Sequence, residues 1–140
     1  LAIGTDGVAS NNDLDMFGET RTAAILAKAV AEDAAAFDAF SALRAATLGG
    51  AKAIGFDHLV GSLEPGKQAD IACVDLSALE TQPLHHVVSQ LIYATGRQQV
   101  SDVWIAGKPK LSARVLVDMD MDRIIANAKQ WRGRIAAIGR

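Results

Sequence analysis

Asp6 is the residue of this sequence whose type and position best fit metal-binding or acid–base chemistry. It follows the apolar run Leu1-Ala2-Ile3 in the stretch LAIGTDGVASNN. Such a run is typical of the end of a buried strand, and a carboxylate just past that end faces the pocket of open or barrel α/β folds. There it can bind a metal ion or act as a general base. The alternative is a turn aspartate bonded to the backbone of Gly7 and Val8, which composition alone favours.

The residues around Asp6 supply small and neutral groups. Gly4 and Gly7 allow close approach of the backbone. Neutral hydrogen-bonding side chains follow at Ser10, Asn11 and Asn12. They strengthen the functional interpretation without deciding it, so both interpretations of Asp6 stay open.

The three histidines do not complete a metal site with Asp6. Adjacent residues such as His85 and His86 point to opposite faces of a strand and diverge by about 100° on a helix. We therefore expect them at the surface or at a helix cap. His58, beside Asp57, is typical of a local hydrogen-bonding residue. No nucleophile with an adjacent base can be assembled either.

The stretch GSLEPGKQADI, residues 61–71, has glycines and a lysine that suggest a phosphate-binding loop. However, the order G-x-x-x-x-G-K-[ST] is absent, and no helix is expected directly after it. We expect a turn that leads into a strand.

Composition predicts a single globular domain, with 140 residues, 50% of them hydrophobic and 21% charged. A net charge of −2 gives no reason to expect nucleic acid or an anionic membrane as a partner. No apolar stretch approaches the roughly 20 residues that span a bilayer, and no signal peptide is recognisable. The lone Cys73, between Ala72 and Val74, is expected to be a buried strand thiol, which fits a reducing cytoplasm.

Periodicity predicts three helical segments before residue 56. The first is capped by Asn12 or Asp13 and ends near Glu32. The second continues until Gly49-Gly50 interrupts it, and a short turn over 51–54 ends at Gly55. The apolar stripes of the first two comprise Thr22, Ile25, Leu26, Ala29 and Val30, then Phe37, Phe40, Leu43, Ala46 and Thr47.

Strands are expected over 69–75 and 100–106, with a turn over 107–109. Two strands do not make a stable sheet, so they need partners from elsewhere. A terminal helix, capped by Asp118 or Asp120, is predicted from a last stripe. That stripe consists of Met121, Ile124, Ile125, Ala128, Trp131, Ile135 and Ile138.

Four segments resemble, in this order, the C-terminal third of amidohydrolase-superfamily deaminases: GTDGVASNNDLDMFGETR, RAATLGGAKAIG, GSLEPGKQADIACVDL and QVSDVWIAGK. The S-x-E-x-G-K-x-A-D-I/L pattern is typical of the superfamily. The SNN-x-LDM stretch resembles the 5-methylthioadenosine/S-adenosylhomocysteine deaminases, a group that also takes in chlorotriazine hydrolases and guanine-deaminase-like enzymes. The resemblance covers almost the whole chain.

This resemblance implies an α/β fold, namely the C-terminal part of a (β/α)8 TIM-type barrel plus strands of a small β-sandwich. Residues 1–56 would hold the last barrel strand, at 1–6, and the barrel-closing helices, at 13–55. Residues 57–116 would supply sandwich strands, and residues 117–140 the C-terminal helix. A larger N-terminal part of the same enzyme would precede Leu1, because the chain opens inside an expected strand.

The resemblance also implies one divalent metal ion, usually zinc, with Asp6 as a ligand. Asp6 would take a proton from metal-bound water as hydroxide attacks the amino-bearing carbon of a purine, and would pass it to the departing ammonia. Ser10 and Asn11 would border the substrate. The family's histidine ligands and its acidic glutamate have no counterpart here, so we expect these residues alone to be inactive.

The predicted activity is hydrolytic deamination of adenosine-type thioethers by the complete enzyme. A chlorotriazine or guanine-type amidohydrolase stays open, because function depends on the site rather than on the scaffold. A non-catalytic assembly module is a further alternative. The expected partners are a purine nucleoside-type substrate and the remainder of the same enzyme, and the last helix is compatible with a homo-oligomer.

Overall fold

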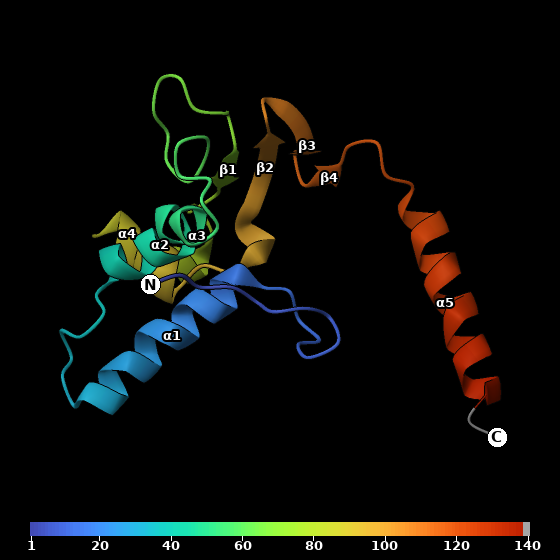
Figure 1. The fold of residues 1–140 in the computed structure, drawn as a ribbon, viewed down its shortest axis with the longest axis horizontal. Coiled ribbons are helices and arrows are strands. Elements are labelled where there is room, and N and C mark those ends of the chain that lie inside the picture. The colour runs from blue at the N-terminus through green and yellow to red at the C-terminus, as the bar shows by residue number, and fades with distance from the viewer. Residues whose placement is uncertain (139–140) are drawn as a thin grey trace.

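The computed structural model describes residues 1–138, which form a helical layer, a small sheet and one separate helix (Figure 1). Short 3-10 turns lie at Leu79–Thr81 and Arg97–Gln99. The helices are α1 (Met16–Ala31), α2 (Ala39–Ala46), α3 (Leu48–Ala53), α4 (Val87–Tyr93) and α5 (Met121–Ile138). The strands are β1 (Ile71–Val74), β2 (Val100–Ile105), β3 (Lys108–Ser112) and β4 (Val115–Leu116).

Helix α1 begins later than the sequence suggests and buries a different face. Its cap is Asp15, whose carboxylate accepts from the backbone N–H of Phe17 at 3.0 Å. The predicted end near Glu32 is confirmed by a left-handed backbone there, with φ 50°. The helix buries Thr20 and Ala24, which lie on the side opposite its stripe of larger apolar residues. Because no described segment covers that stripe, Ile25, Leu26 and Val30 are exposed.

The break between α2 and α3 lies at Thr47, not at the two glycines. Thr47 has φ −121° and ψ −96°, and its hydroxyl donates to the carbonyl oxygen of Leu43 at 2.7 Å. Gly49 and Gly50 instead lie inside α3. A Cβ on Gly49 would overlap the carbonyl oxygen of Leu1, so this glycine permits the N-terminal segment to cross the helix closely.

A small core joins α1, α2 and α4, although no helix is expected from the sequence over the residues of α4. Its buried members are Ala24, Ala39, Ala42 and Ile92. The Arg21 guanidinium reinforces this layer by donating to the carbonyl oxygens of Ile92, at 3.3 Å, and Thr95, at 2.5 Å. Helix α4 therefore packs on the helices of residues 1–56, although it falls within the segment expected to supply sandwich strands.

The sheet is antiparallel throughout, in the order β1-β2-β3-β4. The strand predictions over 69–75 and 100–106 are confirmed by β1 and β2, each slightly shorter. The turn between β2 and β3 lies at Ala106 and Gly107, both with positive φ, which suits a two-residue hairpin. Lys108 and Pro109 already belong to β3, so the turn ends earlier than predicted.

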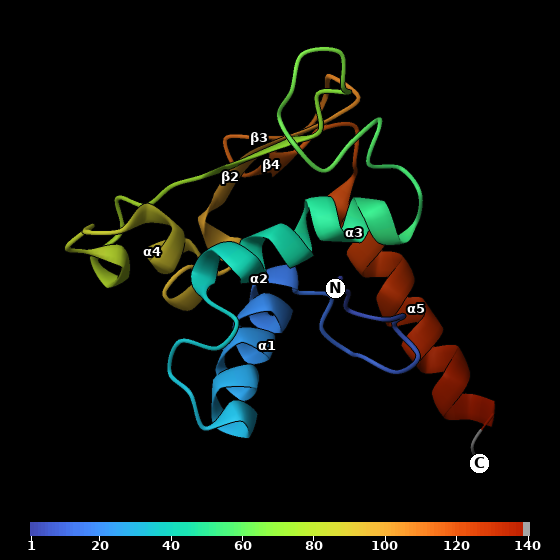
Figure 2. The same ribbon diagram turned by 60° about the vertical axis from the view of Figure 1, so that its left-hand side comes forward.

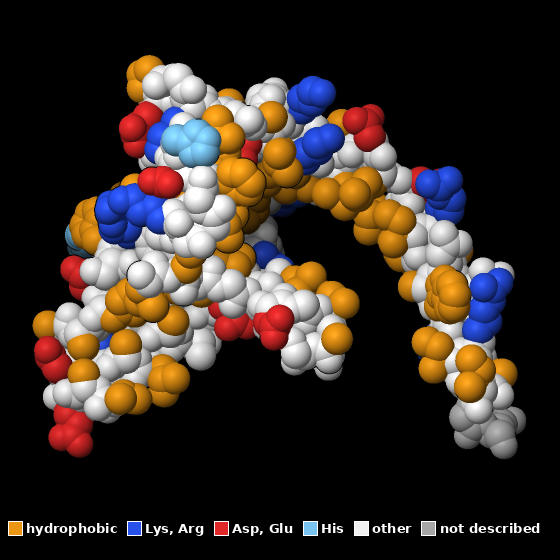
Figure 3. Space-filling model, viewed as in Figure 1, with side chains coloured by type: hydrophobic (Ala, Val, Ile, Leu, Met, Phe, Trp, Pro, Cys, Tyr) orange, Lys and Arg blue, Asp and Glu red, His pale blue; other side chains and the backbone are white. Residues whose placement is uncertain are grey.

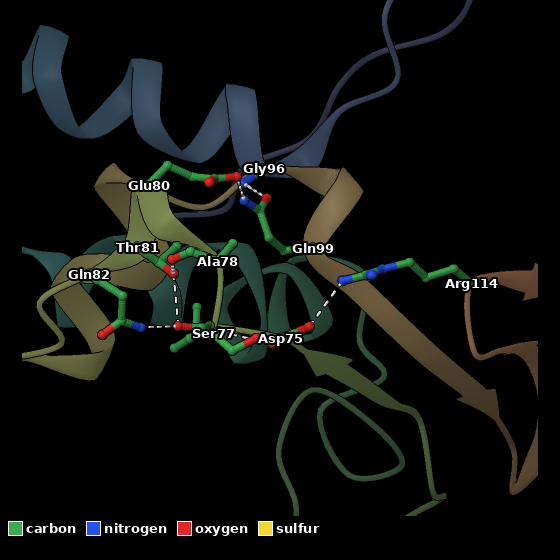
Figure 4. A network of polar contacts seen from close by, with 10 residues as sticks. Asp75, Ser77, Ala78, Glu80, Thr81, Gln82, Gly96, Gln99 and Arg114 are labelled. Carbon is green, nitrogen blue, oxygen red and sulfur yellow. Dashed lines mark hydrogen bonds and ion pairs between the residues drawn. The ribbon is translucent and has the colours of Figure 1, made fainter.

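A set of polar contacts fastens β1 to the turns near β2 (Figure 4). Asp75 accepts from the backbone N–H of Ser77 at 2.9 Å and pairs with Arg114 at 3.2 Å. The buried Gln99 accepts from the Gly96 amide at 2.8 Å and donates to Glu80 at 3.0 Å. Every contact in this set serves the backbone or a surface charge, so its role is structural.

Two expectations of burial are wrong. Cys73 is exposed, because the described residues leave its face of β1 uncovered. Leu1 and Ala2 are also exposed, and residues 1–6 form no strand, because a strand needs a paired neighbour and none of the described segments offers one. The N-terminal segment is instead held by a hydrogen bond from the Ile3 amide to the Ala45 carbonyl oxygen, at 3.2 Å.

Helix α5 stands apart from the other elements in Figure 1, and in the turned view of Figure 2 its first turns are seen behind α3. The predicted cap at Asp120 is confirmed by a hydrogen bond from the Arg123 amide at 2.9 Å. All residues of α5 are exposed, and the last two residues of the predicted helix, 139–140, lie outside the described residues. Among residues 1–138, no helix combines the length and apolarity needed to cross a bilayer.

Candidate functional site

The carboxylate of Asp6 is held by its own loop. Oδ1 accepts from the Gly7 amide and Oδ2 from the Ser10 hydroxyl, each at 2.7 Å. The amides of Ser10 and Asn11 both donate to the Gly7 carbonyl oxygen at 3.0 Å and close the turn. The bond to Gly7 is one of the two backbone contacts expected of a turn aspartate, so the local geometry agrees with that interpretation in part.

The electrostatics of this loop keep Asp6 ionised at neutral pH. The Ser10 hydroxyl, and after it the Gly7 amide, lower the pKa of the Asp6 carboxyl below its ordinary value. The side chain is exposed, with a backbone φ of 58°. That left-handed conformation is uncommon for a non-glycine residue and, where it persists, is often associated with a functional site.

The loop fits a metal ion as the source of one ligand. An ionised carboxylate has about four acceptor positions, and Asp6 uses two of them on Gly7 and Ser10. Its oxygens are of the type that divalent cations accept. Residues 1–138 contain no group of three or more His, Cys, Asp or Glu placed to hold an ion. Further ligands would have to come from outside the described chain.

Asn11 lies deeper in the loop than Ser10 and is more fully bonded. Its Nδ2 donates to the Thr5 carbonyl oxygen at 2.9 Å and to Oε1 of Glu19 at 2.8 Å. Its Oδ1 accepts from the Asp13 amide at 3.0 Å. Both N–H groups of the amide are thus engaged, and sequence reasoning missed Glu19 as a partner because it lies on the following helix.

An ion pair links the loop after Asp6 to the turn before β2. Asp13 forms an ion pair with Arg97, which lies in the 3-10 turn before β2. Both side chains are mostly exposed, so the pair contributes little to the free energy of unfolding. It does place the loop after Asp6 beside the start of β2.

The expected surface or helix-cap positions of His85 and His86 are confirmed. His86 caps α4, because its Nδ1 accepts from the Ser89 amide at 3.1 Å. Its ring also contacts Phe40 edge-on, with 5.9 Å between ring centroids. His58 and His85 are exposed. None of these residues extends the site around Asp6.

The GSLEPGKQADI stretch is a turn that leads into β1, as predicted. The Lys67 ammonium lies 2.6 Å from the Ser62 hydroxyl and 3.4 Å from the Glu64 carboxylate. Asp70, at the end of the turn, accepts from the Ala106 amide at 2.7 Å and so fastens the turn to the β2–β3 hairpin. Because strand β1 rather than a helix follows, the phosphate-loop interpretation has no structural support.

An apolar hollow of about 710 Å³ lies away from the Asp6 loop, between the helical layer and β1. Side chains of α1, α2 and α4 line it, including Phe17, Leu43 and Ile92, and Ile71 lines it from β1. Figure 3 shows further apolar surface on the side of α5 that faces the rest of the molecule, with Lys and Arg on the other side. These surfaces resemble an incomplete core more than a polar binding site.

The profile of the amidohydrolase family matches residues 1–110, so the chain belongs to this family of enzymes. A 5-methylthioadenosine/S-adenosylhomocysteine deaminase from Teredinibacter turnerae is 52% identical over 98% of this chain. A crystal structure of an adenosine deaminase from Xanthomonas campestris with bound zinc is 74% identical over 98% of this chain, with a TM-score of 0.95. The zinc complex of atrazine chlorohydrolase from Arthrobacter aurescens is 30% identical over 89% of this chain, with a TM-score of 0.81.

The chain spans a minor part of these relatives. It covers 31% of the Teredinibacter turnerae protein and 31% of the Xanthomonas campestris chain. It covers 28% of the atrazine chlorohydrolase chain. The crystal structures with bound zinc support a divalent metal in the family. Among residues 1–138, Asp6 is the candidate ligand that the sequence singled out, and no group of three or more metal-binding side chains is present.

Proposed function

We propose that this chain forms part of a metal-dependent hydrolytic deaminase that releases ammonia from adenosine-type thioethers such as 5-methylthioadenosine and S-adenosylhomocysteine. The observation that carries the proposal is the 52% identity, over nearly the whole chain, to a protein named for that activity. The ionised, loop-held carboxylate of Asp6 gives the proposal a chemical group. Alone, these residues would be inactive.

Asp6 is proposed to be both a metal ligand and the group that moves protons. A divalent ion, zinc by analogy with the crystal structures, would lower the pKa of a water molecule toward about 7. The Asp6 carboxylate is ionised at neutral pH, so it can accept a proton on an oxygen and deliver it to departing ammonia. Ser10 orients Oδ2 of Asp6 through its hydroxyl. Ser10 and Asn11 are also the residues proposed to border the substrate.

The proposed architecture is a (β/α)8 barrel with a small β-sandwich, completed by the remaining part of the same polypeptide. Residues 1–6 would be the eighth strand once a neighbour pairs with them, and the predicted boundary near residue 57 would separate barrel from sandwich. The exposed apolar residues of α1 and the apolar hollow support this, since such surfaces require cover. A cytoplasmic location and a homo-oligomer remain predictions.

A triazine hydrolase is the second candidate, and the similarity to atrazine chlorohydrolase favours it. Ammonia release should be measured for the complete zinc-loaded enzyme with 5-methylthioadenosine, S-adenosylhomocysteine and guanine, and chloride release with a chlorotriazine. We expect turnover of an adenosine thioether, and its loss in Asp6→Asn, which keeps the side-chain shape without the charge. Turnover of the triazine alone would replace the proposal, and full activity of Asp6→Asn would remove Asp6 from the site.

A further inference from the structure

The side-chain amide of Asn11 contacts two parts of the chain at once. One N–H donates to Thr5, the residue directly before Asp6, at 2.9 Å. The other donates to Glu19, on the first turn of α1, at 2.8 Å. The amide is a bridge between the Asp6 loop and a helix.

Helix α1 is a firm anchor for this bridge. Asp15 caps the helix, and its carbonyl oxygen accepts from the Glu19 amide at 3.0 Å. Two residues beyond Glu19, the Arg21 guanidinium bonds the carbonyl oxygens at the end of α4. Glu19 is therefore fixed relative to the helical layer on both sides.

The Asp6 loop needs such an anchor. The hydrogen bonds from Gly7 and Ser10 orient the carboxylate relative to its own loop, but they move with that loop. The left-handed backbone of Asp6 has to be maintained by its surroundings. The hydrogen bonds from Asn11 to Thr5 and Glu19 fix the position of the loop relative to α1. Hydrogen-bonded partners of this kind orient metal ligands.

We propose that Asn11 and Glu19 are positioning residues, which hold the Asp6 carboxylate in place through the Thr5 carbonyl group. This inference rests on the proposed role of Asp6 as a metal ligand. It assigns a function to Glu19, on α1, and it gives Asn11 a role distinct from contact with the substrate. An asparagine suits the position because its Nδ2 donates to two oxygens while its Oδ1 accepts from the backbone N–H of Asp13.

Four variants of the complete enzyme separate this bridge from general effects. Asn11→Asp replaces the donating amide nitrogen with an oxygen that faces two acceptors, the Thr5 carbonyl oxygen and the Glu19 carboxylate. Glu19→Ala removes the second of these acceptors. Glu19→Gln keeps an acceptor for Asn11 without the charge. Asn12→Asp is the matched control, because it makes the same change at the exposed neighbouring position. A double variant, Asn11→Asp with Glu19→Gln, restores a donor opposite an acceptor.

Three measurements are needed for each variant: zinc affinity by chelator competition, hydrogen exchange of the peptide over residues 4–12, and the separate values of kcat and KM. We expect Asn11→Asp and Glu19→Ala to weaken zinc binding about 10-fold to 100-fold and to speed exchange, with KM nearly unchanged. Glu19→Gln and Asn12→Asp should stay within about twofold of the unchanged enzyme. The double variant should recover part of the loss seen with Asn11→Asp.

Equal behaviour of Asn11→Asp and Asn12→Asp in all three measurements would overturn the proposal. A rise in KM alone, with normal zinc affinity and exchange, would assign Asn11 to the substrate instead. If the unchanged enzyme neither binds zinc nor releases ammonia, the proposed function fails. Hydrogen exchange still decides the bridge in that case, because loop protection does not depend on a metal or a substrate.

Discussion

The hydroxyl of Ser10 donates a hydrogen bond to Oδ2 of Asp6 across 2.7 Å. The two residues are four apart and belong to one turn, so their contact follows from the loop itself. This relationship makes Ser10 a partner of the carboxylate as well as a residue proposed to border the substrate. The two roles lead to different kinetic consequences.

Replacing Ser10 with alanine removes a bond that orients Asp6. We expect kcat of the complete enzyme to fall about 10-fold, the lower end of what loss of a ligand's partner causes, with KM little changed. Ser10→Thr retains a hydroxyl and should keep most of the activity. An increase in KM without a change in kcat would show that Ser10 acts on the substrate.

The closeness of Gly49 to Leu1 predicts opposite effects for two adjacent glycines. Gly49→Ala would push a methyl group into the Leu1 carbonyl oxygen and within 3.0 Å of that of Arg44, lowering the free energy of unfolding by about 1–3 kcal/mol. In Gly50→Ala the nearest atom would be 3.8 Å away, so helix propensity should raise stability by up to about 1 kcal/mol. Urea denaturation of both variants measures this, and equal shifts would contradict the close approach.

Asp38 gives a stability that depends on pH. It caps α2 by accepting from the Ser41 amide at 2.8 Å, and this bond is the first cause that lowers the pKa of its carboxyl. Because the pKa is lower in the folded state, the stabilisation is present above the unfolded value of about 3.9 and is lost as pH falls through the folded value.

Asp38→Asn isolates this effect, since asparagine caps helices without titrating. We expect the unchanged protein to be the more stable of the two above about pH 5, and the difference to shrink as the pH falls through the lowered folded-state pKa of Asp38. Unfolding midpoints measured across that range test it. A difference that stays constant with pH would assign the gain to something other than the charge.

Trp131 tests whether α5 is covered in the complete enzyme. In this structure its side chain is 58% exposed and contacts the Arg134 guanidinium, 5.0 Å from the ring centroid. Loss of that contact alone would change stability by about 0.5–1 kcal/mol. Burial against the remainder of the enzyme would instead make Trp131→Ala cost about 3–5 kcal/mol.

The matched control is Arg132→Ala, on the neighbouring position of the same exposed helix. It should change the free energy of unfolding by no more than about 0.5 kcal/mol. Thermal unfolding of both variants of the complete enzyme distinguishes the cases. If Trp131→Ala changes the free energy of unfolding as little as Arg132→Ala does, the apolar stripe of α5 is not covered in the complete enzyme.

Local patterns in the sequence predicted those features that short segments determine by themselves. Strands β1 and β2, helix α5 and the end of α1 near Glu32 were predicted from periodicity and turn residues. The hydrogen bond from the Gly7 amide to Asp6 was predicted because aspartate side chains in turns accept from nearby backbone N–H groups. The short helix α4 was missed, because its seven residues make only about two turns, too few to establish a helical pattern.

Which face of each helix is buried was decided by the tertiary structure. The sequence placed the larger apolar residues of α1 on one stripe, yet the residues buried in this structure are the smaller Thr20 and Ala24. Helices α2 and α4 are the ones that contact α1. Periodicity predicts that a helix has an apolar side, but it does not predict which segment covers that side. Cys73 illustrates the same limit, since an apolar neighbourhood in sequence did not place it in a core.

The sequence by itself determined the loop that presents Asp6, because its contacts join residues close together along the chain. It also determined the family, because a match over residues 1–110 depends on residue types along the chain and not on contacts between segments. Only the tertiary structure revealed that Gly49 makes room for Leu1, that Arg21 fastens α4, and that Asn11 ties the loop to Glu19. These contacts depend on how separate segments fold against one another. Hydrogen bonds and steric fit across such distances leave no local pattern to read.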